Sequence, residues 1–171
     1  MVYNASMRLA VRVTLGLLLA AGACGENAAS RHAAAQRERE AALARDPEFG
    51  DALGSALLEQ VAQHAPGWVK RESLRRGTLA ERARQAFLVV LPYGHCYRFV
   101  ASGGAGVIDL DLALFDSNNV EIARDTSEDP APVLGEAASI CPSDASAVRV
   151  EARMRRGSGE FALGVFQSPD Q

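Results

Sequence analysis

Apolar and polar residues alternate with a period of two through most of the second half of the chain. Gly, Asn and Asp gather between the alternating stretches, as in residues 116–119 and 156–159. Short alternating strands separated by such turns are typical of an antiparallel β-sandwich. We therefore predict a mainly β fold, a jelly-roll-like sandwich, over residues 68–167. Its inward positions are Phe87, Val89, Leu91, Ile108, Leu110, Leu112, Leu114, Val148, Val150, Ala152, Met154, Phe161, Leu163 and Val165.

The period changes to that of a helix before residue 67. Asp46 followed by Pro47 is a typical helix start, and Pro66 with Gly67 ends the segment. We predict an amphipathic helix over residues 47–67, which packs on the sheet or, alternatively, docks a partner. Its apolar face consists of residues at intervals of four: Phe49, Leu53, Leu57 and Val61.

Residues 24–46 are predicted to form a leader and a helical spacer. Ala, Arg, Glu and Gln dominate residues 31–45 and favour a helix, but Leu43 is the only large aliphatic residue there. A helix that is polar nearly all round buries little of itself, so we interpret it as a stalk. One or two helices thus precede the sandwich. Residues 78–81 fit either a helix capping box or the end of a strand.

A secretory signal is the simplest interpretation of residues 1–23. Arg8 and Arg12 precede an apolar run of about a dozen residues, which ends in small residues before Cys24. The run is well short of the roughly 20 residues that a membrane-spanning helix needs. We therefore predict an exported protein from which residues 1–23 are removed. Both Met1 and Met7 fit as the start, because the residues between them add nothing that a signal requires.

Cys24 and the small residues before it resemble the lipobox of bacterial lipoproteins, although that family usually has Leu where this chain has Ala21. The resemblance implies that Cys24 is lipidated and anchors the mature chain to a membrane. Gly25 and Glu26 lack the Asp that is linked to inner-membrane retention, which favours the outer membrane. The alternative is an ordinary signal-peptidase cut and a soluble periplasmic or secreted protein.

Charge excludes some partners. The 171 residues carry a formal net charge of −3, which argues against binding nucleic acid or an anionic lipid surface. The charge is unevenly spread: residues 109–129 hold seven acidic side chains and one basic one, whereas residues 70–84 hold six basic and two acidic ones. We interpret these runs as solvated faces.

The two cysteines beyond Cys24 are predicted to form a disulfide. An even pair in an exported chain favours a bridge, here between Cys96 and Cys141. A zinc site is a poor alternative, because the two cysteines lie far apart and only His95 is adjacent. Closing a loop of this length contributes about 4 kcal/mol in the chain-entropy treatment.

Residues 79–166 resemble the bacterial pre-peptidase C-terminal module, a small non-catalytic β-sandwich. The cysteine pair is not a general feature of that family, and no peptidase domain accompanies the module here. The resemblance implies a role in secretion, substrate contact or protein contact. It is carried by Phe87-x-Val89-x-Leu91, Gly94-x-Cys96-Tyr97-x-Phe99, the run from Asp109 through Leu110, Asp111, Leu112, Leu114 and Phe115 to Asp116, Val148-x-Val150 and Phe161-x-Leu163-x-Val165.

Calcium is the most specific candidate ligand, because Ca²⁺ takes six to eight hard oxygen donors and several lie close in sequence. The segment lacks the Gly and distal Glu of an EF-hand loop. The alternative is a solvated strand face with ordinary turn chemistry, in which Asp109 and Asp111 simply point outward. The candidate donors are Asp109, Asp111, Asp116, Asn118, Asp125 and Asp129.

No catalytic constellation is visible. The chain has no G-x-S-x-G elbow and no paired histidine motif. His95 and Cys96 are neighbours that a strand would point to opposite faces. Carbohydrate stacking on Trp68, Tyr93 or Tyr97 competes with simple packing of those rings. We expect no enzyme and no resident cofactor.

These observations predict an exported, lipid-anchored cell-envelope protein whose disulfide-stapled sandwich contacts a protein, a polysaccharide or another envelope component. The alternative is a secreted module that binds calcium or carbohydrate.

Overall fold

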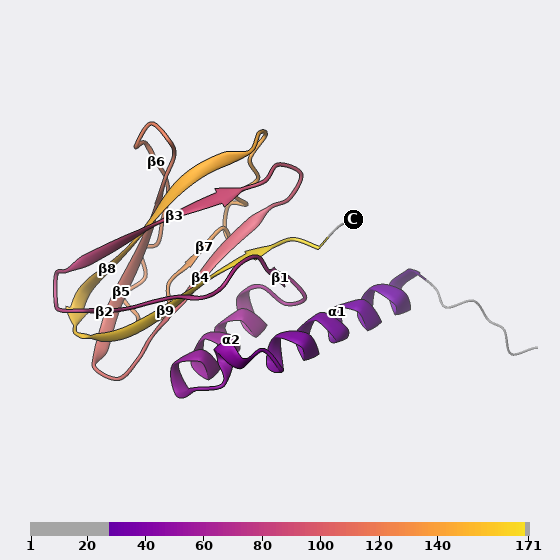
Figure 1. The fold of residues 1–171 in the computed structure, drawn as a ribbon, viewed down its shortest axis with the longest axis horizontal. Helices are drawn as coiled ribbons and strands as arrows, with labels where there is room; N and C mark the ends of the chain where they lie inside the picture. The colour runs from indigo at the N-terminus through magenta and orange to yellow at the C-terminus, as the bar shows by residue number, and fades with distance from the viewer. Residues whose placement is uncertain (1–27, 170–171) are drawn as a thin grey trace, which may run out of the picture.

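The computed structural model describes residues 28–169, so the predicted signal and Cys24 lie outside the described residues. Two antiparallel sheets pack face to face, and two helices lie on one side of them (Figure 1). This confirms the predicted β-sandwich preceded by helices. The elements are α1 (Ala28–Ala44), the 3₁₀ turn η1 (Pro47–Phe49), α2 (Ala52–His64), β1 (Val69–Lys70), β2 (Arg75–Leu79), β3 (Arg84–Leu91), β4 (Tyr97–Gly103), β5 (Val107–Phe115), β6 (Glu121–Arg124), β7 (Val133–Leu134), β8 (Ser146–Gly157) and β9 (Gly159–Gln167).

The two sheets differ in what covers them. Sheet A has the order β1-β9-β4-β7, with β2 also paired to β9, and sheet B has the order β3-β8-β5-β6. The helices cover the outer face of sheet A, through contacts of α2 with β4 and β9 (Figure 1). The outer face of sheet B carries no helix (Figure 1). Any surface chemistry of sheet B therefore faces away from the helices.

Two apolar layers hold these parts together. The first fills the sandwich and includes Phe99, Leu112 and Phe161, all fully buried. The second lies between α2 and sheet A and includes Leu57 and Phe166. The residues predicted to form the apolar face of a helix, Phe49, Leu53, Leu57 and Val61, are all buried in this second layer.

The predicted helix over residues 47–67 is interrupted. Asp46 caps only a single 3₁₀ turn, which ends at Gly50. Asp51 then adopts an extended backbone conformation, and its side chain accepts a hydrogen bond from the Gly54 N–H, so α2 begins there. The sequence contains two Asp caps in succession, and the second one starts the α-helix.

Two further expectations can be compared with the structure. Residues 75–79 form β2, so the alternative of a strand end holds for residues 78–81. The spacer helix α1 is largely exposed, and Leu43 is its buried residue. Neither helix within residues 28–169 is both long and apolar enough to span a bilayer.

Candidate functional site

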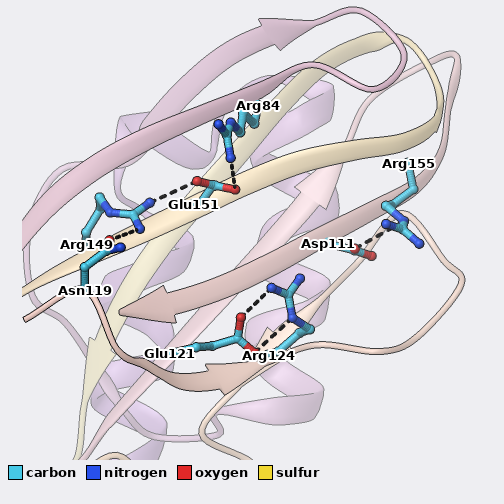
Figure 2. A network of polar contacts seen from close by, with 8 residues as sticks. All are labelled: Arg84, Asp111, Asn119, Glu121, Arg124, Arg149, Glu151 and Arg155. Carbon is cyan, nitrogen blue, oxygen red and sulfur yellow. Dashed lines mark hydrogen bonds and ion pairs between the residues drawn. The ribbon is translucent and has the colours of Figure 1, made fainter. Parts of the chain in front are cut away.

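The outer surface of sheet B presents a row of charged side chains, which we call the charged face. Strands β5 and β8 lie side by side, and their apolar residues turn inward. The intervening residues must then turn outward, because successive side chains of a strand alternate between faces. They are Asp109 and Asp111 on β5 and Arg149, Glu151, Arg153 and Arg155 on β8. Figure 2 shows Asp111, Arg149, Glu151 and Arg155 of this set.

Asp109 and Asp111 point outward as predicted but are not solvated, which corrects the interpretation of a wet strand face. Their exposed fractions are 6% and 8%. The chain beyond β6 continues along β5: Asp125 N–H donates to the Leu112 carbonyl at 2.9 Å, and Leu110 N–H donates to the Asp129 carbonyl at 3.1 Å. The alternation of apolar and polar residues did not predict this folded-back segment, because it is held by backbone hydrogen bonds, which do not depend on residue type.

Each buried carboxylate faces one arginine. Nε of Arg155 lies 3.4 Å from Oδ2 of Asp111 (Figure 2), and Nε of Arg156 lies 3.4 Å from Oδ2 of Asp109. Burial raises the pKa of Asp111; Arg155 opposes this shift, and the neighbouring charges of Asp109 and Asp125 add to it. The other carboxylate oxygen of Asp109 is buried and accepts no hydrogen bond from the described residues.

Further along the face, ion pairs link neighbouring strands. Glu151 lies between Arg149, at 2.9 Å, and Arg84 of β3, at 3.6 Å (Figure 2). The Arg149 guanidinium also donates to Oδ1 of Asn119 at 2.6 Å and stacks 4.0 Å from the centre of the Phe115 ring. These contacts fix the positions of the charged groups at this end of the face.

Arg153 differs from its neighbours. Within residues 28–169 it makes no ion pair or hydrogen bond through its side chain, although it is only half-exposed. It lines a hollow of about 420 Å³ in which positive groups outnumber negative ones. We call this the arginine hollow, and it consists of Arg82, Asp109, Glu128, Arg153, Met154, Arg155 and Arg156. Its lining has four arginines and two carboxylates, so the hollow carries a net positive charge.

The predicted calcium donors are dispersed. Asp116 is engaged in a turn, where its Oδ1 accepts the N–H groups of Asn118 at 2.9 Å and Val120 at 2.8 Å. Asp125 accepts a hydrogen bond from Ser127 at 2.9 Å, and burial raises the pKa of Asp125. Across the part of the chain that the structure describes, no three His, Cys, Asp or Glu residues are grouped so that they could hold a metal ion.

The disulfide is present and closes one end of the sandwich. Cys96, just before β4, is bonded to Cys141, and their Cα atoms are 4.1 Å apart. Next to it, the Tyr97 N–H donates to the Ile140 carbonyl. The disulfide and this hydrogen bond therefore both attach the loop around residues 140–141 to the start of β4. A hollow of about 600 Å³ lies beneath that loop, between Leu91, Ile122 and Ile140 among others. Sequence reasoning did not anticipate this hollow.

The aromatic candidates for carbohydrate stacking are mostly occupied. Tyr97 is fully buried, and its hydroxyl donates to the Pro92 carbonyl at 2.8 Å. Trp68 is half-buried, with the Arg98 guanidinium 4.5 Å from its ring centre. Tyr93 remains exposed. His64, at the end of α2, pairs with Glu136 at 3.0 Å, and Cys96 is bonded to Cys141.

Comparisons with known proteins give a likeness of fold to solved structures, of which twelve chains match. No protein-family model and no curated protein matches the chain. Among solved structures, the chain is similar to the pre-peptidase C-terminal domain of a collagenase from Bacillus anthracis, with 10% sequence identity and a TM-score of 0.44. The match covers 54% of this chain and 86% of that one. At this identity the likeness concerns the fold alone.

Proposed function

We propose that this chain is an exported, non-catalytic protein of the bacterial cell envelope, anchored through lipidated Cys24, whose sandwich binds another envelope component. The observation that supports export is the disulfide between Cys96 and Cys141, because such bridges persist in oxidising compartments and are rare in the cytosol. The resemblance of the residues before Cys24 to a lipobox supports the anchor.

The anchor is tested by intact mass and fractionation. The wild-type chain, expressed in a bacterium, is expected in the membrane fraction with acyl mass on Cys24. Cys24→Ser is expected to move the protein to the soluble fraction without acyl mass. A matched control, Cys96→Ala with Cys141→Ala, is expected to stay acylated, since it removes the disulfide and leaves the signal unchanged. An unmodified soluble wild-type protein would contradict the anchor.

For the bound component, the arginine hollow favours an anionic polymer, and we extend the proposal to an acidic envelope polysaccharide. Arg153 has no partner among residues 28–169, so its guanidinium is available to a carboxylate or phosphate group. Calcium is disfavoured at the same place, because Asp109 and Asp111 each already face an arginine. The charged face also lies on the side of the sandwich away from the helices that follow the anchor (Figure 1).

A carboxylated oligosaccharide such as oligogalacturonate is a suitable probe. We expect salt-sensitive binding that Arg153→Glu weakens about tenfold or more, since a charge-assisted hydrogen bond is worth roughly 1.5–3 kcal/mol. Arg37→Glu is the matched control, because Arg37 is exposed on α1, far from sheet B. If both variants weakened binding equally, the effect would be one of overall charge, and the proposal that the polymer binds in the arginine hollow would be wrong. A parallel titration with a phosphorylated oligosaccharide distinguishes the two kinds of anion.

A further inference from the structure

Strand β3 forms an open edge of sheet B. Within the described residues β3 is paired on one side only, to β8 over all eight of its positions. The ladder alternates between hydrogen-bonded and non-bonded pairs, and Met154 N–H donates to the Ala83 carbonyl. Residues 85, 87, 89 and 91 therefore bond to β8. The backbone N–H and C=O groups of Ala86, Leu88 and Val90 point to the open edge.

The same three residues also expose their side chains on the charged face. Leu88 is 75% exposed and Val90 is 62% exposed, and Ala86 is exposed beside them. Apolar side chains and unpaired backbone groups thus coincide over residues 86–90. An exposed edge of this kind is a ready template for pairing with another strand.

The other edges of the two sheets are protected. Strand β6 has four residues, of which Glu121 and Arg124 form an ion pair. Strand β7 has only two residues. Strand β2 carries Arg75 and Arg76. Short edge strands and charged side chains are the usual means by which proteins prevent edge pairing. Residues 86–91 of β3 contain neither a charge nor a proline, so among the sheet edges formed by residues 28–169 this one lacks such protection.

We propose that β3 pairs antiparallel with β3 of a second copy of this chain, about a two-fold axis that passes through Leu88. In this register Leu88 lies opposite Leu88 of the second copy, and Ala86 lies opposite Val90. Ala86, Leu88 and Val90, whose backbone groups point outward, then meet one another, as the hydrogen-bonded pairs of an antiparallel ladder require. Arg84 is outward by the same alternation and falls opposite Pro92, beyond the end of the strand. The two four-stranded sheets B become one continuous sheet.

The positions of the charged residues are compatible with this register. Arg84 is the charged residue of β3 and falls opposite Pro92 of the second copy, so no two like charges face each other across the pairing. Within each copy Arg84 also remains beside Glu151. Directly opposite residues of an antiparallel pair share one face, so the two charged faces lie on the same side of the joined sheet. The dimer therefore presents two arginine hollows to one polymer.

The mass in solution tests the pairing. We use the exported chain carrying Cys24→Ser, so that the result does not depend on the proposed anchor. Sedimentation equilibrium is expected to give twice the chain mass, and Leu88→Lys is expected to give the single-chain mass. Val120→Lys is the matched control, because Val120 is 57% exposed on the turn before β6, away from β3, and this variant is expected to remain dimeric. A monomeric parent protein, or a dimer unaffected by Leu88→Lys, overturns the proposal.

Cross-linking tests the register. In the same background, Leu88→Cys is expected to form a disulfide-linked dimer on mild oxidation, because opposite Cβ atoms lie about 4.5–5.5 Å apart and a small shift of the strands brings them within reach of a disulfide. Val90→Cys alone is not expected to cross-link, since the two copies of residue 90 are offset by four positions, about 13 Å along the strand. A mixture of Ala86→Cys with Val90→Cys is expected to cross-link. Equal cross-linking of Leu88→Cys and Val90→Cys would overturn this register.

Discussion

Asp111 and Arg155 form an ion pair at 3.4 Å in which the carboxylate is buried and the guanidinium is half-exposed. The arginine does not fully offset the cost of burial, because the pKa of Asp111 stays above its ordinary value of 3.8. An acid with a raised pKa binds protons more tightly in the folded state. Its contribution to the free energy of unfolding is therefore most favourable at low pH and falls as the pH rises through the folded pKa.

The fall in stability with rising pH gives a prediction for the variant Asp111→Asn. Amide and carboxylic acid are similar in shape, and neither is charged. We expect the variant to gain stability relative to the wild type on going from pH 3 to pH 7, as the wild-type carboxyl ionises above its ordinary pKa of 3.8. Urea unfolding at several pH values measures the difference, in which the titration of groups that do not interact with Asp111 cancels.

Val120→Ala is the control for this prediction, because Val120 is 57% exposed and neither side chain titrates. We expect its stability difference from the wild type to be the same at both pH values. If Asp111→Asn instead loses stability towards pH 7, the attraction of Arg155 outweighs the cost of burial.

The disulfide is expected to contribute about 4 kcal/mol to the free energy of unfolding, because it closes a long loop of the unfolded chain. Cys96→Ala with Cys141→Ala should lower the urea midpoint accordingly without changing the fold. Adding reductant to the wild type should give the same loss, and adding it to the double variant should change nothing. An unchanged midpoint in the double variant would contradict this account.

The elements that the sequence predicted are those whose two faces differ. In strands β5 and β8, Leu110, Leu112, Val150 and Ala152 are buried, as their alternation with charged residues predicts. Ile108 was also predicted to face inward, but it is 56% exposed, because the β5–β8 register shifts between Val107 and Asp109. Strands β1 and β7 contain two residues each, too few to show a period. They exist because longer strands, β9 and β4, offer them backbone partners.

The candidate site was less accessible to sequence reasoning. Asp109 and Asp111 were named from their positions, but their burial depends on residues 125–129 folding back along β5. The isolation of Arg153 and the open edge at β3 follow from strand order, which alternation does not determine. An edge strand and an interior strand can have the same pattern of apolar residues.

Leu57 tests whether the helices and the sandwich unfold together. It is fully buried between α2 and sheet A, in contact with the layer that includes Val100 and Phe166. Leu57→Ala is expected to cost about 2–5 kcal/mol, the usual loss for a large-to-small change in a core. Glu59→Ala, an exposed change on the same helix, should stay within about 0.5 kcal/mol of the wild type. We expect one transition by circular dichroism and by tryptophan fluorescence, since Trp68 adjoins this layer. Two separate transitions would mean that α2 detaches first.

Gly157 lies where the turn of residues 157–159 contacts the turn of residues 104–106, at the end of the sandwich opposite the disulfide. Two features of this position require a glycine. Its φ is +84°, and a Cβ there would lie 2.2 Å from the Gly106 carbonyl oxygen. That oxygen accepts the Ser158 N–H, so the turns cannot separate without breaking a hydrogen bond.

Gly94 provides a comparison with only one of these constraints. Its φ is +89°, and nothing lies within 4 Å of a Cβ built on it. Gly94→Ala should therefore cost about 1 kcal/mol, the penalty for a left-handed conformation in a residue with a side chain. Gly157→Ala should cost more than about 2 kcal/mol, because the steric contact adds to that penalty. Thermal unfolding of the two variants measures the difference. Equal losses would mean that the turns of residues 104–106 and 157–159 move apart freely, and that the contact between them does not stabilise this end of the fold.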